Sequence, residues 1–174
     1  MPCRRSTTVR PDVPAIEIRA ASARDAARIC AIYNHHVTAT IVTFDETPLE
    51  AREMARRIRA ATLPWLVIEE AGVLAGYARA SPWKTRPAYR HTVEGSVYVD
   101  PPFQRRGHGR RVYEALIAEL RGRKVHVVLA GIALPNPASI ALHESLGFVP
   151  SGVMREVGWK FGRWIDVGYW ALRF

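Results

Sequence analysis

The stretch from Val97 to Arg110, VYVDPPFQRRGHGR, constrains the fold of this chain more than any other. It predicts the end of a buried strand, a turn set by two prolines, and a basic, glycine-rich loop that opens directly into a helix. Glycine at positions 107 and 109 lets the backbone approach a bound group without obstruction by a Cβ atom. The free N–H groups and the dipole of the first helical turn favour an anion. We therefore expect a phosphate site here, although a glycine-rich surface connection would show the same pattern.

The order of hydrophobic patterns along the chain predicts an α+β domain. Strand-like and helix-like segments follow one another as β-α-α-β-β-β-α-β-α-β-β, which implies a mixed sheet with helices on both faces. Residues 1–15 contain three prolines and no periodicity, and we expect a mobile tail there. Residues 16–174 are expected to form one domain, because no repeat or linker divides them.

Local patterns place the ends of several elements. Ser22 to Asp25 has the form of a capping box, and the residues behind it keep the spacing of one buried helix face. Pro48 is expected at the first position of a second helix. The apolar run Val125–Ile132 is typical of a strand buried on both faces. Asn136 can cap a later helix, which Gly147 ends.

Composition narrows the class of protein. The formal net charge is +9, but the arginines are scattered along the expected helices and do not alternate with aromatic residues, so we expect no nucleic-acid partner. The longest apolar runs are too short to span a membrane, and no signal sequence opens the chain. Cys3 and Cys30 form neither a disulfide framework nor a metal-ligand pattern. We expect a cytoplasmic, reduced protein without a membrane partner.

Several ordered motifs resemble those of the GNAT N-acetyltransferases. The segment Gln104–Gly109 resembles the Q/R-x-x-G-x-G/A signature of this superfamily, and Leu134–Phe148 looks like its second cofactor-contacting motif. The resemblance covers residues 16–174 and implies a mixed, mostly antiparallel sheet flanked by helices on both faces. Four further segments resemble the phosphinothricin acetyltransferase group: Tyr33–His36, Trp83–Tyr89, Val93–Val99 and Gly158–Gly168.

The resemblance implies a binding site for acetyl-CoA. Its pyrophosphate would lie on the backbone amides of the loop, and its pantetheine arm would pair with the preceding strand. Asn136 would contact the cofactor, cap its helix, or do both. The implied cofactor-binding residues are Val97, Tyr98, Val99, Arg105, Arg106, Gly107, His108, Gly109, Arg110 and Asn136.

Two residues are candidates for proton transfer. Glu94 is an acid within a strand otherwise built of small, hydroxyl and apolar residues, where a carboxylate is out of place unless it lines a cleft. The resemblance makes it the base that deprotonates the amine, through water; the alternative is an exposed strand glutamate. His143 stands where many GNAT enzymes carry a tyrosine that protonates the departing thiolate, but a packed core histidine is equally compatible with its helix.

The acceptor site is expected to take a small amine with an anionic group. Lys84 and Arg86 could clamp a carboxylate or phosphinate, because arginine suits bidentate recognition, or they could belong to a solvated basic loop. Tyr89 belongs to the same aromatic loop. By resemblance, Asn34 and Phe44 line the pocket, and the aromatic residues of 159–170 close it or form a homodimer contact. The remaining histidines lack metal-ligand spacing, so no metal is expected.

The sequence therefore predicts an enzyme that transfers acetyl from acetyl-CoA to the α-amine of a small amino acid or analogue, of the phosphinothricin or methionine sulfoximine type. Two other functions stay open. One is acetylation of a protein or peptide amine, for which the basic surface would recruit an acidic partner. The other is a non-catalytic acyl-CoA or nucleic-acid binding module, which the presence of both Glu94 and His143 disfavours.

Overall fold

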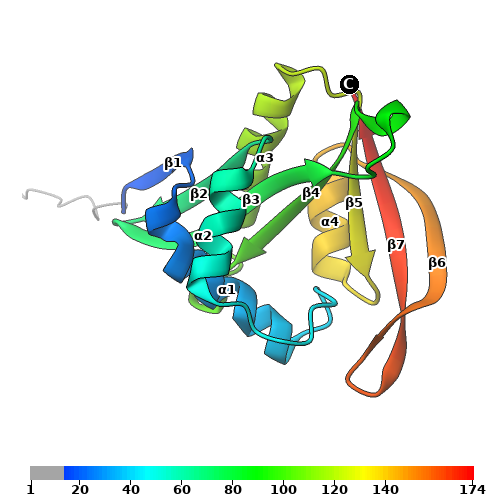
Figure 1. Ribbon diagram of the computed structural model, residues 1–174, viewed down its shortest axis with the longest axis horizontal. Coiled ribbons are helices and arrows are strands. Elements are labelled where there is room, and N and C mark those ends of the chain that lie inside the picture. The colour runs from blue at the N-terminus through cyan, green and yellow to red at the C-terminus, as the bar shows by residue number, and fades with distance from the viewer. Residues whose placement is uncertain (1–13) are drawn as a thin grey trace, which may run out of the picture.

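A computed structural model describes residues 14–174, so the tail expected at residues 1–15 lies almost wholly outside the described residues. Its seven strands form one sheet in the order β1-β2-β3-β4-β5-β7-β6 (Figure 1). Neighbouring strands are antiparallel except β4 and β5, which are parallel. The strands are β1 (Ile16–Ala20), β2 (Trp65–Glu70), β3 (Val73–Pro82), β4 (Thr92–Val99), β5 (Val127–Ala133), β6 (Val149–Lys160) and β7 (Arg163–Arg173).

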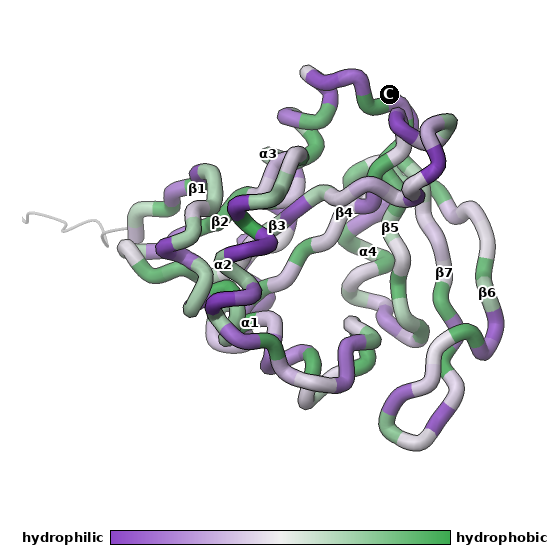
Figure 2. Tube along the Cα trace, viewed as in Figure 1, coloured by the Kyte–Doolittle hydropathy of each residue, from purple (hydrophilic) through white to green (hydrophobic). Residues whose placement is uncertain are grey.

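Helices cover both faces of the sheet, as expected (Figure 1). The α-helices are α1 (Ala26–Ala39), α2 (Ala51–Ala60), α3 (His108–Arg121) and α4 (Pro137–Ser145), and the short 3-10 helices are η1 (Ala23–Asp25), η2 (Pro87–Tyr89) and η3 (Pro101–Phe103). The buried residues of α2, Met54 and Ile58, are four residues apart and so share one side of the helix, whereas its arginines give α2 the hydrophilic stretches seen in Figure 2. None of the helices in the described part of the chain is long and apolar enough to cross a membrane.

Two hydrophobic cores lie on opposite faces of the sheet, because alternate residues of a strand point to opposite sides. In β2, Leu66 and Ile68 pack with α3, whereas Trp65 and Val67 pack with α1 and α2. The predicted element order and the mixed sheet are thus both confirmed. The capping box is also confirmed, since the Ser22 side chain accepts from a backbone N–H and Asp25 reaches back to the cap.

Pro48 does not occupy the first position of the second helix, which begins at Ala51. The reason is a contact from α1. Asn34 Oδ1 accepts from the backbone N–H of Leu49 at 2.8 Å, and Asn34 Nδ2 donates to the carbonyl oxygen of Leu49 at 2.9 Å. These two bonds hold the backbone of Leu49 against α1, so the chain turns into the helix only after this residue.

The strand β5 is fully buried along one face and only partly along the other, although its apolar sequence predicted burial on both. Val128, Ala130 and Ile132 are buried in the core with α3, whereas Gly131 is exposed on the opposite face. Pairing of β5 with β4 ends early, at Glu94 opposite Leu129, and beyond this point the structure pairs β4 with β3 and β5 with β7. The two parallel strands therefore separate in the middle of the sheet.

Candidate active site

A cavity of about 570 Å³ opens where β4 and β5 separate. It extends from the second half of β4 along the basic loop to the first turn of α3, and its other wall is the start of α4. The side of β4 that faces this cavity has no strand partner after Glu94. An extended ligand can therefore hydrogen-bond to the β4 backbone as an added strand does.

The basic loop has the geometry expected for an anion cradle. Gly107 is the N-cap of α3 and has a φ of 83°, a left-handed conformation that side chains disfavour. As glycine it has no side chain to accept from the first N–H groups of α3, which stay available for a ligand. A Cβ atom on Gly109 would lie 3.3 Å from Val99 Cγ2, so glycine here also lets α3 pack closely against β4.

All the residues predicted to bind the cofactor line this cavity, with Arg106 as the exception. The Arg106 guanidinium instead lies 3.4 Å from the Glu70 carboxylate and over the ring of Phe103. The same carboxylate contacts His108 Nε2 at 2.6 Å. Glu70 thus fixes two side chains of the loop from β2, an arrangement without a signal in the sequence.

His143 also lines the cavity and is almost fully buried. Its Nδ1 lies 2.7 Å from the carbonyl oxygen of Ser139, which can only accept, so the proton of the neutral ring sits on Nδ1. Nε2 is buried and finds no partner among residues 14–174. Burial lowers the pKa of His143, which favours this neutral form with a lone pair on Nε2.

His36 of α1 is a further cavity residue that the sequence did not single out for this role. Its Nε2 is likewise buried and unpartnered within the described residues, and burial lowers its pKa. Unpartnered, buried ring nitrogens on two different elements of the cavity lining indicate that the cavity is built for a polar ligand, because such groups are costly when nothing bonds to them.

A second cavity, of about 560 Å³, adjoins the first across the separated strands. The two cavities share lining residues from β4, β5 and the loop after α1: Val42, Ser96, Tyr98, Gly131 and Ala133. A ligand in one cavity can therefore meet a ligand in the other at the point where β4 and β5 part. The second cavity is the candidate acceptor site.

Glu94 lines the second cavity beside this junction. Burial raises the pKa of its carboxyl group, and the nearby cations of Arg79 and Lys84 oppose this rise only in part. A Cβ atom on Gly131 would lie 3.2 Å from Glu94 Oε1, so the glycine on β5 keeps the approach to this carboxylate open. A half-buried carboxylate with a raised pKa has the properties of a general base.

Arg79 on β3 is a cavity residue that sequence reasoning missed. It pairs across the sheet with Ser96, which places it diagonally from Glu94 on the same face, a separation of about 7–8 Å between such neighbours. Its guanidinium lies 5.2 Å from the centre of the Trp65 ring. The signal that identified Glu94, a charge inside an otherwise small and apolar strand, applies equally to Arg79.

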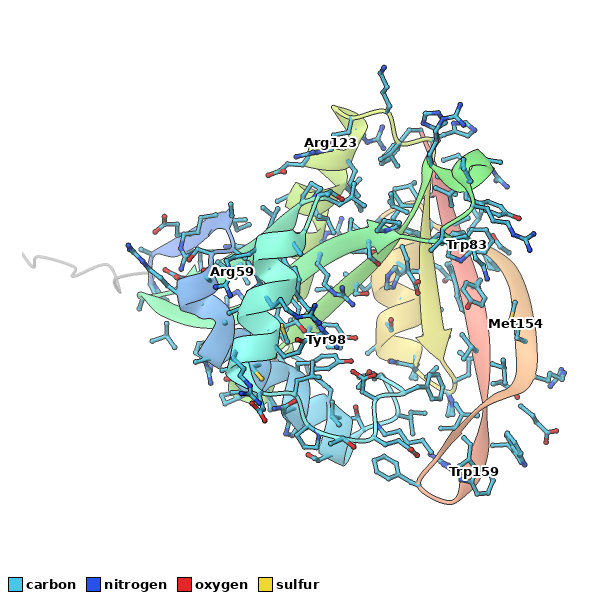
Figure 3. All side chains as sticks on the ribbon, in the orientation of Figure 1. Arg59, Trp83, Tyr98, Arg123, Met154 and Trp159 are labelled. Atoms are coloured by element: carbon cyan, nitrogen blue, oxygen red, sulfur yellow. The ribbon has the colours of Figure 1, made fainter. Side chains whose placement is uncertain are left out.

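The residues predicted to bind the acceptor do not all lie at one site in the structure. Phe44 lines the acceptor cavity, whereas Asn34 holds the backbone of Leu49 and does not. Lys84 and Arg86 line a separate basic cavity of about 580 Å³, and Tyr89 packs edge-on against Trp83. Figure 3 shows Trp83 near the opposite end of β7 from Trp159, which lines the acceptor cavity.

Comparison with known proteins identifies the family. The profile of the acetyltransferase (GNAT) family matches residues 29–148. The chain belongs to this family. Curated relatives include a phosphinothricin N-acetyltransferase of Streptomyces viridochromogenes, 42% identical over 94% of this chain and 91% of the relative. An L-amino acid N-acyltransferase of Escherichia coli is 44% identical over 91% of this chain and 94% of the relative.

Solved structures of the GNAT family share the fold. A putative acetyltransferase from Salmonella typhimurium, solved with its cofactor acetyl-CoA, has a TM-score of 0.89 and 41% identity, covering 91% of this chain and 94% of that one. A phosphinothricin acetyltransferase from Sinorhizobium meliloti in complex with acetyl-CoA has a TM-score of 0.88 and 35% identity, covering 91% and 88%. The chain is thus an acetyl-CoA-dependent N-acetyltransferase with a mixed, mostly antiparallel GNAT sheet.

The groups that line the first cavity suit the chemical parts of acetyl-CoA. A glycine-capped helix N-terminus suits the pyrophosphate, and an unpaired strand edge suits the amides of the pantetheine arm. No group of three or more His, Cys, Asp or Glu side chains that could hold a metal ion occurs among the residues described.

Proposed function

We propose that this GNAT enzyme acetylates the α-amine of a small amino acid or amino-acid analogue. The observation that carries the proposal is that the two cavities meet beside Glu94. Arg79, on the neighbouring strand β3, is a diagonal neighbour of Glu94 on the same face of the sheet. Relatives support the acceptor class: besides the phosphinothricin enzymes, an L-methionine sulfoximine/L-methionine sulfone acetyltransferase of Salmonella typhimurium is 42% identical over 90% of this chain.

The charges of the acceptor cavity suit an α-amino acid. Arg79 offers a guanidinium to the carboxylate, and Glu94 offers a carboxylate to the amine. The apolar wall formed by Phe44, Val157 and Trp159 is left for the amino-acid side chain. An amino acid would therefore lie with its amine toward the junction of the two cavities.

Acetyl-CoA supplies the activated acetyl group. The first turn of α3 and Arg105 and Arg110 would hold its diphosphate, and the free edge of β4 would orient the thioester end, where a backbone N–H can stabilise the developing oxyanion. The first turn of α3 and the free edge of β4 are fixed relative to each other before the ligand arrives, because α3 packs tightly on β4 through Gly109. The chain thus orients the donor with backbone groups more than with side chains.

Two proton transfers are assigned to Glu94 and His143. Glu94 takes a proton from the acceptor amine, directly or through water, and its raised pKa suits this task. His143 can give a proton to the thiolate from Nε2 only after it has gained a second one, since its resting proton sits on Nδ1. The proposed acid role of His143 therefore requires proton uptake during the reaction.

A thiol-release assay over a panel of amines tests the proposed acceptor class. We expect acetyl-CoA-dependent thiol release with phosphinothricin, methionine sulfoximine or related L-amino acids, and little with their α-N-methyl or decarboxylated forms. The second candidate, peptide acetylation, has one relevant neighbour: a ribosomal-protein-alanine N-acetyltransferase structure from Brucella melitensis is 40% identical with a TM-score of 0.87. Release with alanine-terminated peptides but with no free amino acid would favour that candidate.

We also propose that the enzyme forms a homodimer through β6. This strand is an edge of the sheet, is 12 residues long and is exposed over almost its whole length (Figure 1). Apolar side chains that are about half exposed follow it: Val149, Val153, Met154, Val157 and Trp159. A long, apolar edge strand is a ready site for pairing with another copy. A second copy would also lie beside the acceptor cavity, which Val157 and Trp159 line.

Sedimentation velocity tests the dimer. We expect the unmodified chain to sediment as a dimer and Val153→Glu to sediment as a monomer, because a charge in an apolar interface must be desolvated. Val73→Glu is the matched control, since Val73 is similarly exposed but lies on β3. A monomer for the unmodified chain, or the same loss of dimer in both variants, would contradict the assignment. The cytoplasmic location and the absence of nucleic-acid and membrane partners stay predictions from the sequence.

A further inference from the structure

The apolar wall of the acceptor cavity is made by two segments that are far apart in the sequence. One is the loop after α1, which contributes Val42, Thr43 and Phe44. The other is the end of β6, which contributes Val157, Gly158 and Trp159. The acetyl-CoA-binding residues of β4 and α3 belong to neither segment. Contacts between the two segments themselves must therefore fix their separation.

Lys160 joins the two segments. Its side chain is only 2% exposed, and its ammonium donates to the carbonyl oxygen of Thr43 at 2.7 Å. Burial lowers the pKa of Lys160, and the carboxylates of Asp45 and Glu46 partly counter that effect. Burying an ammonium is costly unless it makes defined contacts, and lysine is among the residues least often buried. The side chain is therefore better explained as a structural cross-link than as a surface charge.

A second contact joins the same two segments of the cavity wall. The ring of Phe44 rests directly on the backbone of Gly158, where a Cβ atom would lie 2.1 Å from Phe44 Cε1 and 2.4 Å from Cζ. Only a residue without a side chain can accept the ring in this position. The other side of the ring is open, because Phe44 remains 39% exposed and lines the cavity.

The loop is also tied to α1. The hydroxyl of Tyr33 donates to Asp45 Oδ2 at 2.7 Å and lies 2.8 Å from Thr43 Oγ1. Since Tyr33 has a single hydroxyl proton, Thr43 is the donor in the second bond. The loop is thus held on the α1 side by Tyr33 and on the β6 side by Lys160, with Phe44 between the two attachments.

A β-bulge directs the end of β6 toward the loop. The register of β6 against β7 shifts between Met154 and Gly158, and Glu156 has a φ of 51°. Asp166 on β7 stabilises the bulge, because its Oδ1 accepts from the backbone N–H of Glu156 at 2.8 Å. Bulges often re-aim side chains next to active sites. Here the bulge places Val157 and Gly158 in the cavity wall.

We propose that Lys160 and Gly158 act as a latch that fixes Phe44 at the apolar end of the acceptor cavity and so sets the largest acceptor side chain the enzyme accepts. The inference rests on the proposed function of this cavity as an amino-acid site. Lys160 is a positioning residue, because it acts through Thr43 and Phe44 and does not line the cavity itself. Gly158 determines specificity by the space it leaves to the ring.

The test compares Lys160→Met and Gly158→Ala with Arg163→Met, an exposed cation on the same hairpin. The readouts are kcat and KM for acetyl-CoA and for L-amino acids whose side chains lengthen by one methylene at a time. Lys160→Met frees Phe44, so we expect the preference for shorter over longer side chains to fall by about tenfold, within the usual range per methylene. Gly158→Ala pushes the ring into the cavity, so we expect that preference to rise. Arg163→Met should match the unmodified enzyme.

A uniform loss toward all acceptors, or an effect confined to the KM for acetyl-CoA, would overturn the latch. Hydrogen exchange of the amides of residues 41–46 gives a second readout that needs no acceptor. We expect faster exchange in Lys160→Met than in Arg163→Met, and equal rates would also overturn the proposal. If the unmodified enzyme acetylates no amino acid, the proposed function fails, and hydrogen exchange still decides whether Lys160 holds the loop.

Discussion

Replacing Glu94 with glutamine is expected to lower kcat by about 100-fold or more, the usual scale for loss of a general base. Glutamine keeps the size of the side chain and its polar contacts but cannot take a proton from the acceptor amine. The KM for acetyl-CoA should stay within about twofold, because Glu94 lines the acceptor cavity and not the donor cavity. Steady-state kinetics with both substrates measures the two effects separately.

The pH dependence gives the same residue a second, independent test. A base acts only when it is deprotonated, and burial raises the pKa of Glu94. Activity should therefore be full well above this raised pKa and be lost as the pH falls through it, at a pH higher than an exposed glutamate would give. In Glu94→Gln this acidic limb should disappear from the profile of kcat/KM.

The control is Glu119→Gln, which removes an exposed carboxylate near the end of α3 that lines neither cavity. Its kinetics should equal those of the unmodified enzyme. Turnover in Glu94→Gln that stays within threefold of normal would remove Glu94 from the mechanism. The proton would then have to pass to a water held by hydroxyl groups of the acceptor cavity, such as those of Ser81, Ser96 and Tyr98.

The donor half of the site could be predicted from the sequence because its determinants are local. A glycine with a positive φ, a helix start and a strand end lie within fourteen residues, and each has its own signature. Glu94 was proposed by the same local reasoning, as a charge inside a strand, and it lines the acceptor cavity. The unpaired edge of β4 could be inferred only by resemblance, because the sequence alone does not show where two parallel strands separate.

The acceptor half depends on residues brought together by the tertiary fold. Asn34 was predicted to line the pocket, but its partner, the backbone of Leu49, is fifteen residues away and leaves no pattern. The apolar sequence of β5 predicted burial on both faces, but Gly131 is exposed. The reason is that a cavity, and not the core, lies against this part of the strand. Lys160 was not singled out in the sequence, because its burial and its bond to the carbonyl oxygen of Thr43 depend on a loop far away along the chain.

Arg79→Ala is expected to raise the KM for the acceptor by about 100-fold, because losing one partner of a buried, hydrogen-bonded charge pair costs about 2–5 kcal/mol. The KM for acetyl-CoA should change little, since Arg79 lines only the acceptor cavity. Arg79 also lowers the pKa of Glu94. Removing its charge should therefore move the acidic limb of the pH profile to higher pH, whereas Arg79→Lys should keep the limb and lose only bidentate binding.

Arg86→Ala is the matched comparison, because Arg86 was the arginine predicted from the sequence to clamp the acceptor. It lines the separate basic cavity, so its removal should change the acceptor KM by less than about threefold, as for a surface substitution. A larger rise of the acceptor KM in Arg86→Ala than in Arg79→Ala would show that the loop of residues 83–89 binds the acceptor. Since this loop does not line the acceptor cavity of its own chain, that result would be explained by the loop reaching the cavity of a second copy. Val153→Glu should then lose acceptor binding together with the dimer, which acceptor kinetics and sedimentation velocity of that variant measure.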